Sequence, residues 1–365
     1  MAILLERGQN VKREDLADLL SRIDNRGTPA TSIIPKGQEP TNTLFEWSVD
    51  DHEAPANAGH VDGVDLLRRS DDNSSTDFGN MSPDRTKCAG RIQIFQKAFG
   101  VSTLAQQVSD VAGVGRKAEM KESIKKALVS LKRGIEAQIC SESDSQADNG
   151  TVPYLTRGLF SWVGQTGSGT TENQPSDLTI PTLAQTPATQ VFRGDIDAAA
   201  PNGFNESDMQ DLLEALFNST GGNSNYQLLC GTKLKRRFTT FATYDPGLTN
   251  TTALRTYNQD STSKKIVQTV DVFVGDFGQV DLIPSHWLRY GTSDGGDDTD
   301  EHKAARQNGS GLILDSSLLR LRYNSLPSFH QLDDEGGGEK GFVRAILGLQ
   351  VTNPKGLGAI VDTTT

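Results

Sequence analysis

The sequence predicts an α+β protein, and two segments carry most of that prediction. Residues 117–139 place apolar side chains along one helical stripe, which predicts an amphipathic α-helix about 35 Å long. Residues 266–288 alternate in polarity on both sides of a glycine-bounded turn at 275–278, and this period of two predicts a β-hairpin. The stripe of the helix consists of Met120, Ile124, Ala127, Leu128, Leu131, Ile135 and Ile139, and its charged face of Lys121, Glu122, Lys125, Lys132, Arg133 and Glu136.

The N-terminal part of the chain predicts one short helix followed by extended segments. Residues 11–23 carry apolar side chains at helical spacing, and Pro29 follows in a turn that ends this helix. Residues 32–37 are predicted to be extended, and 43–50 to form a half-buried strand. The apolar face of that strand carries Phe45, Trp47 and Val49.

Between residues 62 and 89 the chain is polar and rich in turn-forming residues, so this stretch supplies little apolar core. Order is expected to return at 91–101, where apolar residues again indicate a strand. Two strands that flank a long polar tip together predict an extended, hairpin-like arm.

The second half of the chain predicts one more helix and several strands. A capped amphipathic helix is predicted over 205–217, followed by a buried strand at 226–230. Alternation is weak over 317–323 and clearer over 342–351, which is followed by a short tail. The stretches predicted to be irregular are 141–200, apart from an apolar island at 158–163, and 291–311.

The composition argues against an integral membrane protein. The 365 residues carry a formal net charge of -11, 35% are hydrophobic, and the mean hydropathy is -0.46. No run approaches the ~18 consecutive apolar residues that a membrane-spanning helix requires. The N-terminus shows no secretory signal, so we expect a chain made and kept in a cytoplasm. The acidic balance also argues against broad electrostatic binding of nucleic acid.

The cysteines and histidines lack the spacing that a metal site requires. Cys88, Cys140 and Cys230 are widely separated and odd in number, so free, partly buried thiols are expected rather than disulfides. The five histidines are scattered and form no HxxxH or HExxH motif. No metal or other cofactor is therefore expected.

Two glycine-rich segments resemble nucleotide-binding loops without their essential parts. Residues 164–171 have the glycine spacing of a phosphate-binding loop, but Thr170 occupies the lysine position and no helix is predicted to follow. Residues 113–118 show GxGxxA spacing before a helix, but the preceding segment is a poor buried strand. A loop and a helix cap are the favoured interpretations, and a cytoplasmic nucleotide-binding α/β enzyme remains an alternative function.

Two charged clusters are interpreted as solvated surface. A calcium site is an alternative for the acidic cluster, but the cluster lacks the alternating ligand spacing of an EF-hand, so a mobile acidic loop is favoured. The basic cluster is short enough for one exposed helix face, although a contact with phosphate groups stays an alternative. The acidic residues are Asp294, Asp297, Asp298, Asp300 and Glu301, and the basic residues are Lys233, Lys235, Arg236 and Arg237.

Several short motifs are individually weak but specific in their order. They are LFEW at 44–47, RIQIF at 91–95, LKRGIE at 131–136, GGN at 221–223 with LKRR at 234–237, DFG at 276–278 and LQVTN at 349–353. In this order they resemble the major capsid proteins of tailed bacteriophages. The resemblance implies an α+β chain with the HK97-like (Hong-Kong-97-type) phage capsid fold.

The resemblance also implies how the chain is divided. The expected parts are an N-terminal arm at 1–40, an extended loop at 41–102, a peripheral domain at 103–195 with a spine helix at 117–139, an axial domain at 196–300, and a return to the peripheral domain at 301–365.

The implied function is structural, without catalytic, cofactor-binding or metal-binding residues. Copies of the chain would form the hexamers and pentamers of an icosahedral shell in the virion, assembled in the host bacterial cytoplasm and independent of any membrane. Expected partners are a portal, a scaffold or decoration protein if one is needed, and double-stranded DNA packaged without sequence-specific binding. A decoration or tail-tube protein is a further alternative, which the long helix disfavours. The residues expected to contact neighbouring subunits are Phe45, Trp47, Val49, Ile92 and Phe95.

Overall fold

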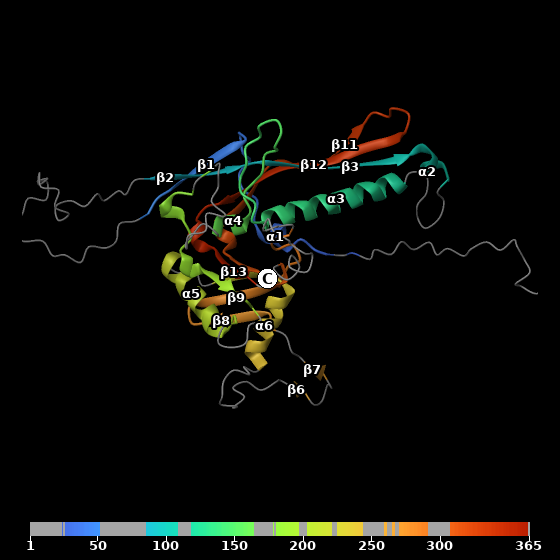
Figure 1. Cartoon of the computed structure of the whole chain (residues 1–365). Helices are drawn as coiled ribbons and strands as arrows, with labels where there is room; N and C mark the ends of the chain where they lie inside the picture. Colours follow the sequence, from blue (N-terminus) through green and yellow to red (C-terminus); the bar gives the residue numbers. More distant parts are fainter. Residues whose placement is uncertain are drawn as a thin grey trace, which may run out of the picture.

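The computed structural model of the chain combines a long helix with three main β-structures (Figure 1). A two-stranded ribbon and a three-stranded sheet lie above a six-stranded sheet in the view of Figure 1, and the long helix α3 runs beneath the three-stranded sheet. The residues that the structure describes are 24, 26–51, 85–108, 118–163, 178, 180–196, 203–220, 225–243, 259–260, 265–266, 270–290 and 307–363.

The three-stranded sheet is antiparallel, in the order β11-β12-β3, and α3 packs on one of its faces. The predicted long helix is confirmed as α3 (Ala118–Ile139), which buries Ala127, Leu131, Ile135 and Ile139. The strands are β3 (Gln93–Ser102), β11 (Leu319–Leu332) and β12 (Gly338–Val351).

Strand β11 is much longer than the weak alternation over 317–323 predicts. It continues to Leu332 through two irregularities of register, which lie between Tyr323 and Ser328 around Pro327. Each irregularity shifts the side-chain alternation, so the period of two is lost from the sequence although the pairing with β12 continues.

The six-stranded sheet has the order β4-β13-β10-β5-β9-β8, and both of its faces are covered. Helices α5 (Glu206–Thr220) and α6 (Thr232–Thr243) pack on one face, and α4 (Leu159–Val163) on the other. The strands are β4 (Val191–Gly194), β5 (Asn225–Cys230), β8 (Val272–Gly275), β9 (Gly278–Pro284), β10 (Gly311–Leu314) and β13 (Gly358–Asp362).

The prediction of a short tail after residue 351 is wrong, because strand β13 lies there. It is buried along its whole length between β4 and β10. Five residues buried on both faces show no alternation, so their sequence gives no strand signal of period two.

The predicted β-hairpin is confirmed as β8 and β9, joined through Asp276 and Phe277. Phe273 faces the core and packs edge-on against Phe238 of α6, while Val272 and Val274 are exposed. Since β8 is an edge strand, its valines have no neighbouring strand beyond them in the described chain.

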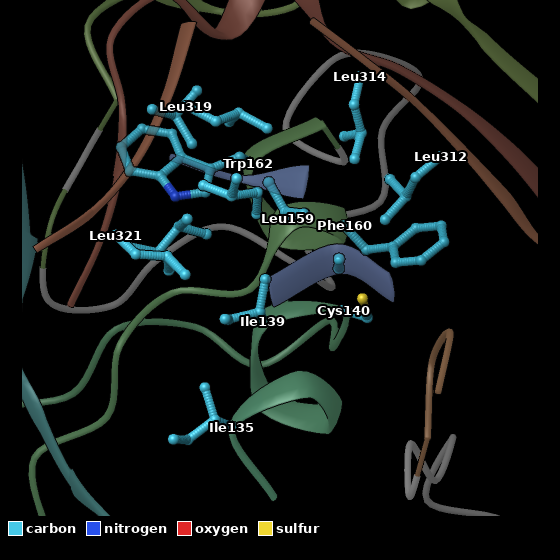
Figure 2. Packing of buried hydrophobic residues seen from close by; sticks show 14 of the residues in the cluster. Ile135, Ile139, Cys140, Leu159, Phe160, Trp162, Leu312, Leu314, Leu319 and Leu321 are labelled. Atoms are coloured by element: carbon cyan, nitrogen blue, oxygen red, sulfur yellow. The ribbon is translucent and has the colours of Figure 1, made fainter. Parts of the chain in front are cut away.

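One hydrophobic core lies between α3, the three-stranded sheet and the near face of the six-stranded sheet (Figure 2). Trp162 of α4 lies between Leu319 and Leu321 of β11 and its own neighbour Leu159, with Leu312 and Leu314 of β10 on the far side of α4. The predicted apolar island at 158–163 is thus a fully buried helical turn that joins the two sheets.

The described part of the chain also includes several smaller elements. They are α1 (Pro29–Ile33), α2 (Thr103–Val108), four 3₁₀ turns (Thr182–Ala184, Ala188–Gln190, Ser316–Leu318 and Pro354–Gly356), β6 (Gln259–Asp260) and β7 (Lys265–Ile266). Pro29 begins α1, since proline is well tolerated at the first helical position, and the helix predicted before it at 11–23 lies outside the described residues. The extended segment predicted at 32–37 therefore begins only at Ile34.

The capped helix predicted over 205–217 is confirmed as α5, and its cap is reciprocal. Asn205 Oδ1 accepts a hydrogen bond from the Asp208 backbone N at 3.1 Å, and Asp208 Oδ2 accepts one from the Asn205 backbone N at 2.8 Å. These bonds satisfy donors that a helix start otherwise leaves unpaired.

Replacing Asn205 with alanine is expected to lower the free energy of unfolding by about 1 kcal/mol, because Asp208 N then loses its acceptor. Urea titration followed by circular dichroism measures this loss. Asn205→Asp retains an acceptor and serves as the control, so equal losses in both variants would contradict the capping role.

Candidate assembly surface

Strands β1 (Leu44–Val49) and β2 (Thr86–Arg91) form an antiparallel ribbon, here called the arm. The strand predicted over 43–50 is confirmed, with Phe45 buried and Trp47 half-buried on one face. The second strand of the arm was predicted at 91–101, which is wrong: β2 occupies 86–91, and 93–102 is β3 of the three-stranded sheet. The predicted polar tip falls mostly within 52–84, outside the described residues.

The chain changes partners at Ile92. The backbone N of Ile92 donates to Thr43 O at 3.1 Å, which closes the root of the arm. One residue later, Gln93 pairs with Leu347 of β12. The arm is therefore rooted directly on the three-stranded sheet.

A continuous stack of rings and guanidinium groups fixes the arm to the body. Arg322 of β11 lies 4.8 Å above the ring of Phe45, which stacks on Trp47 at a centroid distance of 5.9 Å. Trp47 meets Trp162 of α4 at 5.8 Å, and the guanidinium of Arg157 lies 4.6 Å from the Trp162 ring. Such contacts add to the free energy gained from burial of the rings alone.

Two glycines make room for this stack. A Cβ atom at Gly90 would lie 2.7 Å from Phe45 Cζ, and one at Gly348 would lie 2.6 Å from Phe45 Cε1. Both distances are too short for a carbon–carbon contact. The ring of Phe45 thus fills a space that β2 and β12 leave open.

The five residues predicted as intersubunit contacts lie along β1, at the junction of β2 and β3, and in β3. Phe45, Ile92 and Phe95 are buried within the chain, while Trp47 and Val49 are only half-buried. The indole N–H groups of Trp47 and Trp162 are enclosed and have no hydrogen-bond partner.

A second contact holds the chain N-terminal to the arm, here called the strap (residues 26–33), against α3. Glu136 is fully buried, and its carboxylate accepts from the backbone N of Ala30 at 2.6 Å and of Thr31 at 2.7 Å. This corrects the placement of Glu136 on the solvated face of the helix, since α1 covers that part of α3. Burial raises the pKa of Glu136, and the two N–H donors oppose that shift.

Further bonds extend the strap contact. Arg133 Nη2 donates to Arg26 O at 3.2 Å, and Trp287 Nε1 donates to Gly27 O at 2.8 Å. The strap therefore touches both the long helix and the loop after β9. No signal in the sequence pairs Glu136 with residues 30–31, because the partners are 106 and 105 positions apart.

Replacing Glu136 with glutamine is expected to lower the free energy of unfolding by about 1–3 kcal/mol. A glutamine amide can accept from only one of the two strap N–H groups, and its own NH₂ group faces the other donor. Thermal melting measures the stability, and the rate of tryptic cleavage at Arg26 measures the attachment of the strap.

The matched control is Glu46→Gln, which weakens an exposed ion pair with Lys87 at 3.3 Å. Its expected effect is within about 0.5 kcal/mol. Equal cleavage at Arg26 in the unaltered chain and in Glu136→Gln would show that Glu136 does not hold the strap.

The comparison with protein families decides the identity of the chain. A family model described as SU10 major capsid protein matches residues 5–364, nearly the whole sequence. The chain belongs to the SU10 major capsid protein family. No curated protein sequence matches it. The role of this capsid protein is therefore structural, as the order of its sequence motifs implied.

Solved structures similar to this capsid protein come from phage-like particles. A chain from Mycobacterium phage Adephagia aligns with TM-score 0.57 and 10% identity, covering 100% of this chain and 99% of the other. The capsid of a native GTA particle aligns with TM-score 0.57 and 10% identity over 98% of both chains. The capsid of cyanophage P-SCSP1u gives TM-score 0.54 and 9% identity over 98% and 95%. At such identities the likeness concerns the fold, and it confirms the predicted α+β HK97-like architecture.

The basic cluster of the capsid protein is engaged within the chain itself. Lys233 Nζ lies 3.0 Å from Asp362 Oδ2, and Lys235 Nζ lies 3.0 Å from Asp271 Oδ1. Arg237 Nε donates to Phe204 O at 2.6 Å. The interpretation as a merely solvated face is therefore wrong for three of the four residues, whose contacts fix α6 to its surroundings.

Cys88, Cys140 and Cys230 are unpaired and buried, as predicted, and burial raises the pKa of Cys88 and of Cys230 to about 11. Among the described residues, no group of three or more potential ligands is placed to hold a metal ion, and no helix is long and apolar enough to cross a membrane. The segments outside the described residues include the helix predicted at 11–23, both glycine-rich segments (164–171 and nearly all of 113–118) and the acidic cluster at 294–301.

Proposed function

We propose that this capsid protein assembles with copies of itself into pentamers and hexamers, which close an icosahedral head around double-stranded DNA. Membership of the family and the HK97-like fold support a shell subunit. Repetition of a few contacts around a closed symmetric shell turns modest interfaces into a stable particle.

The observation that carries this proposal is the arm. A two-stranded ribbon is at best marginally stable on its own, and here only its inner face packs on the body. Glu46, Ser48 and Lys87 on its other face are exposed. An arm that projects from a firmly stacked root gains stability when it lies across a neighbouring copy.

The five predicted contact residues take two roles in this proposal. Trp47 and Val49, which remain half-buried, would touch the neighbouring subunit directly. Phe45, Ile92 and Phe95, which are buried, would fix the direction in which the arm leaves the body.

The same proposal assigns the parts of the chain. The N-terminal arm is 1–40, the extended loop 41–102, the peripheral domain 103–195 with 301–365, and the axial domain 196–300. The packing of α3 on the three-stranded sheet supports a peripheral unit. A second buried cluster beneath α5 and α6 supports an axial unit.

The proposed partners are a portal, a scaffold or decoration protein if one is needed, and DNA held without sequence-specific contacts. Assembly is proposed to occur in the bacterial cytoplasm, and the subunit is proposed to have no catalytic activity. The alternatives, a nucleotide-binding enzyme and a decoration or tail-tube protein, account less well for the family match and the long α3.

Electron microscopy of the protein expressed alone, beside its mass from light scattering, tests the proposal. Hollow polyhedral shells, or rings of five and six copies, are expected. A monomer that binds ATP or NAD would contradict the proposal and revive the enzyme alternative.

A further inference from the structure

The far end of the β11–β12 hairpin, here called the acidic tip (residues 332–339), carries exposed acidic side chains and an exposed leucine. Asp333, Asp334, Glu335 and Glu339 are exposed there. Leu332 is 45% exposed, and Leu326 on the same hairpin is 53% exposed. Asp334 Oδ1 accepts from the backbone N of Gly336 at 2.8 Å and of Gly338 at 3.0 Å, so the turn itself is well formed.

Helix α3 carries an exposed surface of opposite charge. Lys121, Lys125, Val129 and Lys132 follow one another at i, i+4, i+8 and i+11, so they lie along one line of the helix, here called the lysine stripe. All four are exposed, and Val129 is 39% exposed. In the described part of the chain, the strap contacts α3 at Arg133 and Glu136, and the four residues of the stripe stay exposed.

Among the described residues, no ion pair joins the acidic tip to the lysine stripe of the same chain. The acidic tip belongs to the sheet that packs on the apolar face of α3, and the lysine stripe runs along the flank of the helix beside that face. Figure 1 shows the end of the hairpin on one side of β3 and α3 on the other side. Strand pairing over the whole length of β12 holds the tip there.

We infer that the acidic tip of one subunit docks on the lysine stripe of a second copy. Carboxylates would meet ammonium groups at the rim, and the exposed leucines of the hairpin would cover Val129. A contact between two different surfaces of the same chain is heterologous, and repetition of such contacts closes rings or shells. The inference rests on the proposed function and names one of its interfaces.

Cross-linking of assembled particles tests the inference. A chain with Lys125→Cys and Glu335→Cys is assembled and treated with a short bis-maleimide. The native thiols are buried, so reaction at the two introduced cysteines dominates. A ladder of covalently joined subunits on a denaturing gel is the expected result, and each single-cysteine chain should give no ladder. Intact particles without a ladder, or a bridge within one subunit, would overturn the inference and leave the proposed function standing.

Reversal of the charges on the lysine stripe and on the acidic tip is a second, independent test of the inference. Lys121→Glu with Lys125→Glu, and separately Asp333→Lys with Glu335→Lys, should each reduce the yield of particles at least fivefold. The combination of all four changes should restore most of the yield. Arg236→Glu on α6, an exposed cation that forms no ion pair with the described residues, should leave the yield unchanged. Absence of restoration would overturn the inference, as would intact particles that lose DNA only in the lysine variants, since that pattern assigns the stripe to DNA. Failure of the unaltered chain to assemble under any condition would overturn the proposed function as well.

Discussion

Replacing Trp162 with alanine is expected to lower the free energy of unfolding by about 3–5 kcal/mol, as found for large aromatic residues in protein cores. The side chain is 1% exposed and lies where α4 meets β11 and β10. Its removal leaves a cavity, separates Trp47 from the body and leaves Arg157 without its aromatic partner. Chemical denaturation of unassembled subunits measures the loss.

Phe217 provides the matched control for Trp162. It is 41% exposed on α5 and contacts Phe277 at the surface, so Phe217→Ala should cost only about 1 kcal/mol or less. Equal losses in the two variants would mean that Trp162 does not join the two sheets in the way its packing indicates.

Replacing Trp47 with alanine is expected to abolish most particle assembly while the subunit remains folded. The substitution interrupts the stack between Phe45 and Trp162, so the arm loses its fixed direction and its half-buried contact surface. The subunit itself should lose about 1–3 kcal/mol, because the side chain is only partly buried. Particle yield by sedimentation, measured well below the melting temperature of the variant, separates the two effects.

Trp47→Phe is the control for this prediction. A phenyl ring can still stack between Phe45 and Trp162, so most of the particle yield should return. Normal heads from Trp47→Ala would refute the assignment of β1 to an intersubunit contact.

The sequence predicts the elements whose signal is local. The apolar stripe of α3 is long enough to stand out, and β8 and β9 are separated by a short turn with glycine at both ends. The cap of α5 involves residues three positions apart. Each of these signals depends on residues that are close together in the sequence, where periodicity and capping preferences apply.

The elements that the sequence missed depend on distant partners. Strand β2 contains Gly90 and small or polar neighbours, because the ring of Phe45 occupies the space beside it. Strand β13 is buried on both faces, and β11 changes its alternation at two irregularities. None of these features produces a regular pattern along the chain itself.

The candidate assembly surface also combines residues that local sequence patterns predict with residues that only tertiary packing brings together. Phe45 and Trp47 could be predicted as partners on one strand, because they share one face of β1. Trp162, Arg157 and Arg322 could not, because tertiary packing alone brings them to the stack. Glu136 has the sequence environment of an exposed helix face, and only the strap explains its burial.

A cryo-electron-microscopy reconstruction of the particles formed by this chain tests the central claim most directly. The expected map is a closed shell of pentamers and hexamers in which the β1–β2 arm of each subunit lies across a neighbouring copy. Discrete monomers or small oligomers, or a shell in which every arm contacts only its own subunit, would contradict it.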